Sequence, residues 1–386
     1  MRSSILLGAV AMSIAACSDA TSPTPAASRL TKASAQLSAE RQGAARGGVF
    51  TATNGVNGNA VVAFARAGDG SLTYAGTFST GGKGIGGTTD PLGSQYSLVL
   101  DGEDDRLLFV ANAGSNDVST FRVDGAGLSL VGTTSSGGSL PVSLATTHHT
   151  LYVLNAGSNT ISGFDIDEDG SLSPDAGASS SLAAGAAGAA AVRASRDGQW
   201  LVVTEKGSRT IDVFKVSGNG ALSAPVRSVS NGVTPFGFDF VNGDQLAVSE
   251  AGSGAASLYD ISNGGSLTVE SASVSTNGQA APCWLIATTN GRFAYTANAG
   301  SGTISGYSIG TNGMTLINAG GVTGSTGAGS TPLDLDLSRG DRYLYVLESG
   351  AGRIGAFAVG PDGGLTALAG IGGLARTGGL QGLAAY

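Results

Sequence analysis

One unit recurs seven times along the 386-residue chain, and this recurrence constrains the fold more than any other feature of the sequence. Each copy contains an apolar run, an Asn or Glu, a glycine-containing turn and a second apolar run. The Asn or Glu, which we call the marker residue, lies at Asn54, Asn112, Asn155, Glu205, Glu250, Asn298 and Glu348. The mean spacing is about 49 residues, and such a period with several β patterns per unit is typical of a β-propeller.

Each unit resolves into four predicted strands. Alternation of apolar and polar residues with period two marks the first strand, as at residues 235–240 and 332–337. The apolar runs before and after the marker give the second and third strands. A pair such as Asp169-Gly170 or Asn312-Gly313 then leads to the fourth strand, because Asp-Gly and Asn-Gly supply the positive φ of a tight hairpin. The pattern therefore predicts an all-β chain.

The two ends of the repeated region complement each other. No first strand precedes Val49 in the first unit, whereas residues 381–386 have the first-strand pattern with nothing after them. We therefore predict a seven-bladed β-propeller over residues 48–386, with the ring closed by the C-terminal strand in the first blade. Such closure leaves no unpaired inner edge.

The N-terminus has the pattern of a secretion signal. Arg2 precedes an apolar stretch from Ile5 to Ile14, which is too short to cross a bilayer as a helix. The stretch ends in Ile14-Ala15-Ala16-Cys17, which resembles a bacterial lipobox. We predict a lipoprotein signal peptide over residues 1–16 and a lipidated Cys17 with a flexible tether over residues 17–47. The protein would then be extracytoplasmic and lipid-anchored, at the outer membrane in a Gram-negative cell; an ordinary secretory signal is the alternative.

The predicted ligand site is one mouth of the central channel. The loops that enter the first strands and the turns after the markers share this face, because the second strand of each unit returns to it. The predicted lining comprises Tyr96, Ser143, Trp284, Asp334, Gln381, Asn112, Asn155, Glu205, Glu250, Asn298 and Glu348. The asparagines are predicted to be structural, whereas converging glutamates would raise the pKa of at least one carboxyl; solvated acids around a wide funnel are the alternative. His148 and His149 fall in a turn on the opposite face, so we predict no metal and no cofactor.

The repeated pattern LYVxNxGSxTIxxF resembles the lactonase family of seven-bladed propellers, which includes 6-phosphogluconolactonase-like and carboxymuconate cyclase-like proteins. Enzymes of this family carry Pro-Arg-His at the start of one first strand and Asn-Glu at the end of the next strand. Here Glu205 matches the acid, but the Pro, Arg and His positions are occupied by Ala189, Ala190 and Ala191. The resemblance therefore implies the propeller scaffold and one acid of a lactonase, without its basic groups.

These observations lead to two functional hypotheses. The first is a binding scaffold at the cell envelope, whose partner is a neutral small molecule or an envelope protein or glycan. The second is a hydrolase of neutral lactones with Glu205 as general base and with Tyr96, Ser143, Glu250, Trp284, Asp334 and Glu348 binding the ligand. The formal charge of −8 disfavours nucleic acid and anionic substrates.

Overall fold

The computed structural model describes residues 45–101, 106–147, 149–376 and 379–386. Over these ranges the secondary structure consists of strands, and no helix there has the length and apolarity that a membrane crossing requires. The predicted signal peptide, the lipidation at Cys17 and nearly all of the predicted tether lie outside the described residues. The first strand begins at Ala45, three positions before the predicted start of the propeller at residue 48.

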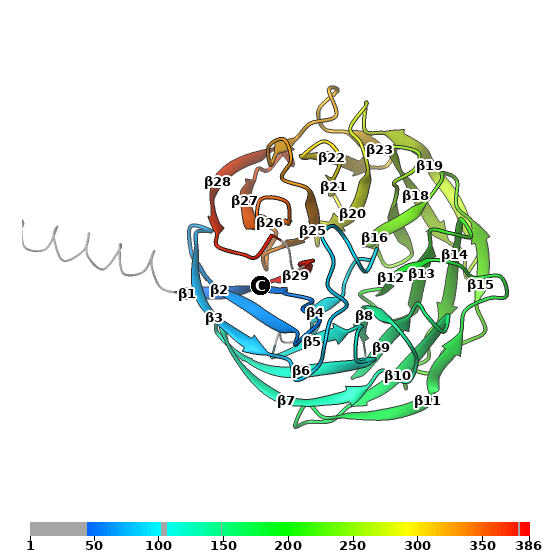
Figure 1. The fold of residues 1–386 in the computed structure, drawn as a ribbon. Coiled ribbons are helices and arrows are strands. Elements are labelled where there is room, and N and C mark those ends of the chain that lie inside the picture. The colour runs from blue at the N-terminus through cyan, green and yellow to red at the C-terminus, as the bar shows by residue number, and fades with distance from the viewer. Residues whose placement is uncertain (1–44, 102–105, 148, 377–378) are drawn as a thin grey trace, which may run out of the picture. The chain divides into compact units, whose positions relative to one another are not determined.

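Seven antiparallel sheets surround a central axis (Figure 1). We name the strands of each blade A to D from the axis outward. Blade 1 contains β29 (Gln381–Ala385), β1 (Ala45–Ala52), β2 (Ala60–Ala67) and β3 (Leu72–Ser79). Blade 2 contains β4 (Leu98–Leu100), β5 (Leu107–Asn112), β6 (Asp117–Asp124) and β7 (Gly127–Ser135). Blade 3 contains β8 (Pro141–Thr147), β9 (Thr150–Asn155), β10 (Thr160–Ile166) and β11 (Leu172–Ser181).

The remaining four blades follow the same order. Blade 4 contains β12 (Ala189–Ala194), β13 (Trp200–Glu205), β14 (Thr210–Lys215) and β15 (Val226–Val229). Blade 5 contains β16 (Pro235–Asn242), β17 (Gln245–Glu250), β18 (Ala255–Ile261) and β19 (Leu267–Ser275). Blade 6 contains β20 (Pro282–Ala287), β21 (Phe293–Asn298), β22 (Thr303–Gly310), β23 (Gly313–Leu316) and the short β24 (Gly324–Ser325), which also pairs with β22. Blade 7 contains β25 (Pro332–Leu337), β26 (Tyr343–Glu348), β27 (Arg353–Val359) and β28 (Leu365–Gly372).

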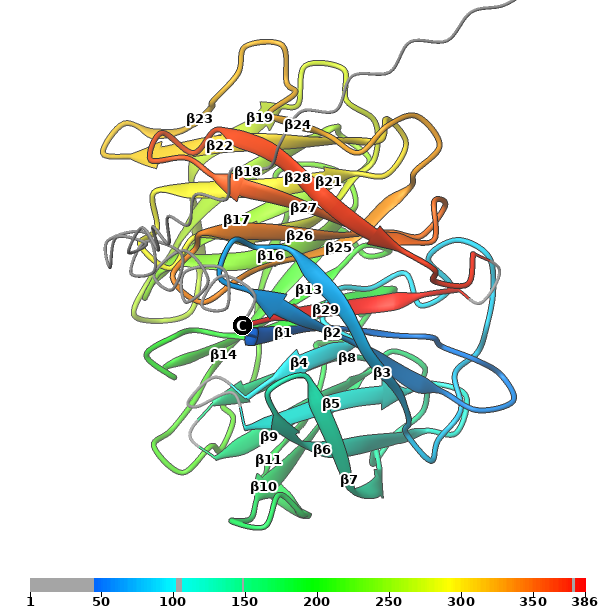
Figure 2. The same ribbon diagram turned by 90° about the vertical axis from the view of Figure 1, so that its left-hand side faces the viewer.

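The predicted closure of the ring is confirmed. Strand β29 pairs with β1 in antiparallel register, with Val49 opposite Ala385 and Thr51 opposite Leu383. The edge-on view shows the C-terminal strand against the first strand of the chain (Figure 2). The two ends of the described chain thus share one sheet, and the C-terminal strand supplies the innermost of the four strands of blade 1.

The blades are connected by a recurring tyrosine contact. A tyrosine in strand B donates its hydroxyl hydrogen to a glycine carbonyl in the C–D turn of the next blade, with oxygen separations of 2.7, 2.9 and 2.8 Å. The pairs are Tyr152 with Gly220, Tyr295 with Gly363, and Tyr345 with Gly70. These three glycines have φ between 79° and 85°, a left-handed conformation that favours glycine. The Asp-Gly and Asn-Gly turns of the repeat therefore form hairpins and also receive the neighbouring blade.

Candidate functional site

The predicted channel mouth is filled by the chain itself. Residues 90–97, which we call the plug, come from the loop between β3 and β4 and cross to blades on the other side of the ring (Figure 1). The Gln95 backbone N–H donates to the Ala190 carbonyl at 3.0 Å, and its side-chain amide donates to the Leu285 carbonyl at 2.8 Å. A Cβ at Gly237 would lie 2.0 Å from Gln95 Oε1, so glycine is required for this close approach.

Trp284 packs against the plug and bonds it. Its side chain is 1% exposed, and its indole N–H donates to the Ser94 carbonyl at 2.9 Å. Phe236 packs edge-to-face against it with ring centroids 5.2 Å apart, and the Lys206 ammonium lies over the Phe236 ring and donates to the Gly93 carbonyl. The prediction that Trp284 is presented to a ligand is therefore wrong, because the plug covers the indole.

Six of the seven marker side chains bond residues of their own blades, and Asn54 bonds the loop at Ile85 and Gly86. Glu205 and Glu250 are fully buried and Glu348 is 2% exposed, so their predicted position at an open mouth is wrong. Four markers bond the serine seven positions later on strand C, as in the pairs Asn112–Ser119, Asn155–Ser162, Glu250–Ser257 and Asn298–Ser305. The markers thus connect strand B to strand C at the blade edge, which agrees with the structural role predicted for the asparagines.

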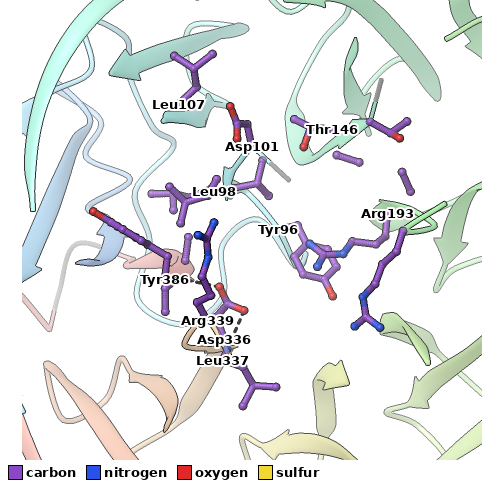
Figure 3. A pocket seen from close by; sticks show the side chains of 18 of the residues that line it. Tyr96, Leu98, Asp101, Leu107, Thr146, Arg193, Asp336, Leu337, Arg339 and Tyr386 are labelled. Atoms are coloured by element: carbon purple, nitrogen blue, oxygen red, sulfur yellow. Dashed lines mark hydrogen bonds between the residues drawn. The ribbon is translucent and has the colours of Figure 1, made fainter. Parts of the chain in front are cut away.

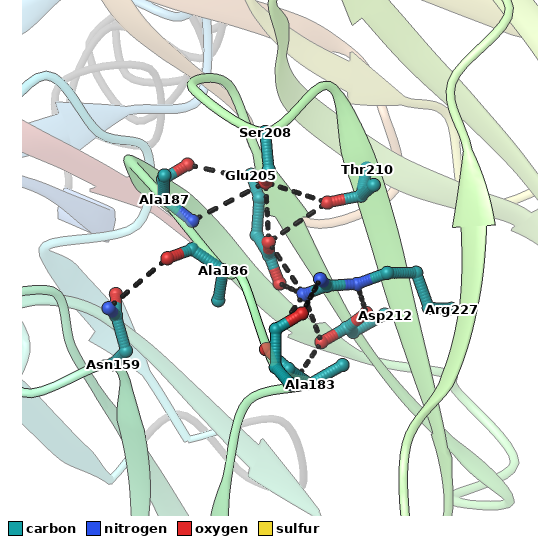
Figure 4. A network of polar contacts seen from close by, with 10 residues as sticks. Asn159, Ala183, Ala186, Ala187, Glu205, Ser208, Thr210, Asp212 and Arg227 are labelled. Atoms are coloured by element: carbon teal, nitrogen blue, oxygen red, sulfur yellow. Dashed lines mark hydrogen bonds and ion pairs between the residues drawn. The ribbon is translucent and has the colours of Figure 1, made fainter.

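Glu205 belongs to a buried charged network (Figure 4). Nη2 of Arg227 lies 2.9 Å from both carboxylate oxygens of Glu205, and Nε of the same arginine lies 2.9 Å from Oδ1 of Asp212. The hydroxyls of Ser208 and Thr210 donate to Glu205 Oε2 at 2.6 and 2.9 Å. Burial raises the pKa of Glu205, and neighbouring Asp212 raises it further. Residues of the same blade bind both oxygens of the Glu205 carboxylate, and no open space beside it remains for a substrate. Its predicted role as a general base is therefore not supported by this geometry.

The channel opens on the opposite face, among the A–B and C–D turns. A cavity of about 960 Å³ lies there, large enough for a small organic ligand. Of the predicted ligand-binding residues, only Tyr96 borders it. His149 also borders it. The prediction kept histidine out of the site by placing the ligand at the other mouth of the channel, whereas the cavity lies on the face of His149. His148 lies outside the described residues. Within the described ranges, no group of three or more His, Cys, Asp or Glu side chains could hold a metal ion.

Arg193, near the end of β12, borders this cavity beside Tyr96 (Figure 3). Its guanidinium carbon lies 4.5 Å from the centroid of the Tyr96 ring, and its Nε lies 3.3 Å from Oδ1 of Asp239. The Tyr96 hydroxyl donates to the Phe238 carbonyl at 2.7 Å, which fixes the ring under the guanidinium. The Arg193 side chain remains 33% exposed, so a ligand in the cavity can reach it.

Polar side chains of the A strands connect neighbouring blades. Oγ of Ser143 accepts the Val192 N–H at 2.9 Å, and Asp239 accepts the Ala287 N–H at 3.0 Å. Asp334 accepts the Leu383 N–H at 3.2 Å, and Asp336 accepts the Ala385 N–H at 2.8 Å. Ser143 and Asp334 are buried by these contacts, which contradicts their predicted place in a ligand site. Asp336 differs from them because it also borders the cavity.

Burial raises the pKa of Asp334 to about 8. The folded state therefore keeps a proton that the unfolded chain releases near the ordinary aspartate pKa of 3.8, so this group lowers stability as pH rises between about 4 and 8. We expect Asp334→Asn to flatten this decline and to gain about 3–4 kcal/mol relative to the wild type between pH 5 and pH 8. Urea unfolding at both pH values measures it. Glu270→Gln, at an exposed position, is the control, and a decline for Asp334→Asn as steep as that of the wild type contradicts the prediction.

Sequence reasoning missed Arg193, Asp239 and Asp336 as site residues. All three lie on A strands, and the acids are the polar members of the alternation at residues 235–240 and 332–337. Their charge was the available signal, because a charged side chain on the innermost strand of a propeller must face either the channel or a neighbouring blade. The longest step between markers, 58 residues from Asn54 to Asn112, was the signal for the plug.

The profile described as "Lactonase, 7-bladed beta-propeller" matches residues 56–181 and 144–280, together more than half of the chain. The chain belongs to the lactonase family. Among solved structures, this lactonase-family propeller is similar to a candidate 6-phosphogluconolactonase of Bacteroides fragilis, with a TM-score of 0.68 and 18% identity over 86% of this chain and 97% of that chain. It is also similar to the periplasmic gluconolactonase of Pseudomonas aeruginosa, with a TM-score of 0.63 and 18% identity over 86% of this chain and 98% of that chain. At these identities the likeness shows the fold alone. No curated protein matches the chain.

Proposed function

We propose that this lactonase-family propeller is an extracytoplasmic binding protein, which takes a small ligand in the cavity among the A–B turns. The observation that carries the proposal is the state of Glu205. This one acidic match to the family's catalytic segment is buried and bonded to Arg227, Ser208 and Thr210. The basic positions of that segment are alanines, which supply no group to polarise a lactone carbonyl.

The proposed location rests on the N-terminal sequence. A short apolar stretch followed by Ile14-Ala15-Ala16-Cys17 supports secretion and lipidation at Cys17. The periplasmic location named for the similar Pseudomonas aeruginosa protein is in keeping with this proposal. An anchored propeller would place its cavity in the envelope, where an envelope protein or glycan is an alternative partner to a free small molecule.

Hydrolysis of neutral lactones is the second candidate function. Family membership favours it, and one further observation supplies a candidate general base. Burial raises the pKa of Asp336 to about 7, and this carboxylate borders the cavity. A carboxylate with a pKa near the working pH is suited to remove a proton from attacking water. Asp336 thus offers this function a base that Glu205, enclosed in its blade, does not.

We expect the full-length protein to leave lactones at their spontaneous rate of hydrolysis. The test follows acid release by pH-stat from a neutral sugar lactone, its 6-phosphate and an acyl-homoserine lactone. Glu205→Gln and Asp336→Asn serve as paired variants. Saturable hydrolysis lost only in Glu205→Gln would restore the predicted base, and hydrolysis lost only in Asp336→Asn would establish the second candidate. Either result overturns a purely binding function.

A further inference from the structure

We propose that the cavity binds a small carboxylate with a hydroxyl or amino group on the adjacent carbon, with Arg193 receiving the carboxylate and Asp336 accepting from the neighbouring donor. This inference rests on the proposed binding function and names the ligand class for it. The cavity lies on the face opposite to Glu205 and to the alanines that replace the family's basic groups.

The guanidinium of Arg193 is only partly used by the protein. Its contacts are the stacking on Tyr96 and the ion pair from Nε to Asp239. Within the part of the chain that the structure describes, neither Nη1 nor Nη2 makes a hydrogen bond. A carboxylate matches this free edge, because two parallel N–H···O bonds join a guanidinium to a carboxylate.

Asp239 does not compete with a ligand for this edge. Its Oδ1 accepts the Phe240 N–H at 2.9 Å, and its Oδ2 accepts the Ala287 N–H at 3.0 Å. These two bonds hold the carboxylate between two A strands, at 3.3 Å from Nε of Arg193. The aspartate therefore anchors one side of the guanidinium, while Tyr96 supports its face. The arginine is presented to the cavity in a fixed position, which lowers the entropy lost on binding.

Asp336 adds the second half of the recognition. It borders the same cavity and is half-buried, and its oxygens accept the N–H groups of Leu337 and Ala385, both at 2.8 Å. Each carboxylate oxygen accepts more than one hydrogen bond, so acceptor capacity remains. A bare carboxylate beside Asp336 would be repelled, whereas a ligand with a donor next to its carboxylate satisfies both side chains.

Charged side chains of both signs line the cavity. Its arginines, besides Arg193, are Arg106, Arg122, Arg196 and Arg339, and its acids are Asp101, Asp167, Glu168, Asp239, Asp336 and Asp341. Such a mixed lining suits a ligand that carries both a carboxylate and a hydrogen-bond donor better than it suits a simple anion. The carboxylate is therefore assigned to Arg193 by the local geometry, not by an excess of positive charge around the cavity.

The test measures binding by NMR titration of the full-length protein with small probes. Glycerate and alanine carry a carboxylate beside a hydroxyl or an amino group, propanoate lacks the donor, and glyceramide lacks the charge. We expect glycerate or alanine to bind at least tenfold more tightly than propanoate and glyceramide. The stronger of the two identifies whether the donor is a hydroxyl or an amine.

Variants then assign the contacts. Arg193→Met is expected to weaken the best probe at least tenfold, and Asp336→Asn is expected to reduce its preference over propanoate. Arg193→Lys keeps a cation near Asp239 but lacks the paired, coplanar N–H donors of a guanidinium. It is expected to fold and still to bind the probe weakly. Arg376→Met, at an exposed position outside the cavity lining, is the matched control and is expected to bind normally.

Each outcome is decisive for the inference. Glyceramide binding as tightly as glycerate would overturn the carboxylate class while leaving a binding cavity, and so would unchanged affinity in both Arg193 variants. Absence of binding by glycerate and alanine overturns the ligand class as well. The proposed function is judged separately, because it fails only if the pH-stat experiment detects catalysis.

Discussion

A chain truncated after Gly379 is expected to lose its cooperative fold, because the deletion removes β29 from the first blade. Leu380 and Leu383 are 2% and 3% exposed, and removing a buried leucine side chain costs about 2–5 kcal/mol. The deletion also breaks the pairing with β1 and the bonds from Leu383 and Ala385 to blade 7, at about 1 kcal/mol each. The expected loss of roughly 8 kcal/mol rivals the whole stability of an ordinary domain, about 5–15 kcal/mol.

Thermal and urea unfolding followed by circular dichroism measure this effect. The control adds back a synthetic peptide of residues 380–386, which should restore the transition by pairing with the vacant edge of β1. A peptide of scrambled sequence should not restore it. An unchanged melting temperature after truncation would show that the closing strand contributes little, and the closed-ring account of stability would then fail.

The fold could be predicted because each repeat carries its own signals. The alternation of residues 332–337, the Asp-Gly turns and the marker spacing are local properties, and seven copies reinforce one another. The C-terminal closure could be predicted by counting strands, since the first unit lacked its first strand and residues 381–386 had the first-strand pattern without a following unit. The plug was not predicted, because its partners Ala190 and Leu285 lie about 100 and 190 positions away and no repeat pattern connects them.

The candidate site was misplaced for a different reason. A marker at the end of strand B can turn toward the channel or into its own blade, and the repeat period does not distinguish these directions. The serine seven positions later was the informative signal, since it provides a partner within the blade for Glu250. Glu205 has Asp212 at that position, and two neighbouring acids required a cation that the pattern did not reveal, which Arg227 supplies from strand D.

The same arginine leads to the second large expected effect. Arg227→Met should lower the free energy of unfolding by about 3–5 kcal/mol near neutral pH, because it leaves two buried acids without a countercharge. Glu205 and Asp212 side chains are fully buried, whereas Arg227 is 22% exposed and bonds both of them. Urea unfolding measures the loss. Arg122→Met is the matched control, since it makes the same change at an exposed strand C position, and it should cost less than about 0.5 kcal/mol.

The pH dependence of the loss separates a missing countercharge from simple loss of packing. Burial raises the pKa of Glu205 even with Arg227 present, and removal of the arginine will raise it further. The folded variant will then keep a proton that the unfolded chain releases near the ordinary glutamate pKa of 4.5, so the stability of the variant falls as pH rises above that value. The deficit relative to the wild type should therefore shrink on acidification from pH 7 toward pH 5.

Replacing all three groups, as Glu205→Gln, Asp212→Asn and Arg227→Met, should recover most of the stability at pH 7, because no buried charge is left unpaired. A deficit that is constant with pH and persists in the triple variant would mean that Arg227 acts by packing alone, and that Glu205 is not held in place by charge.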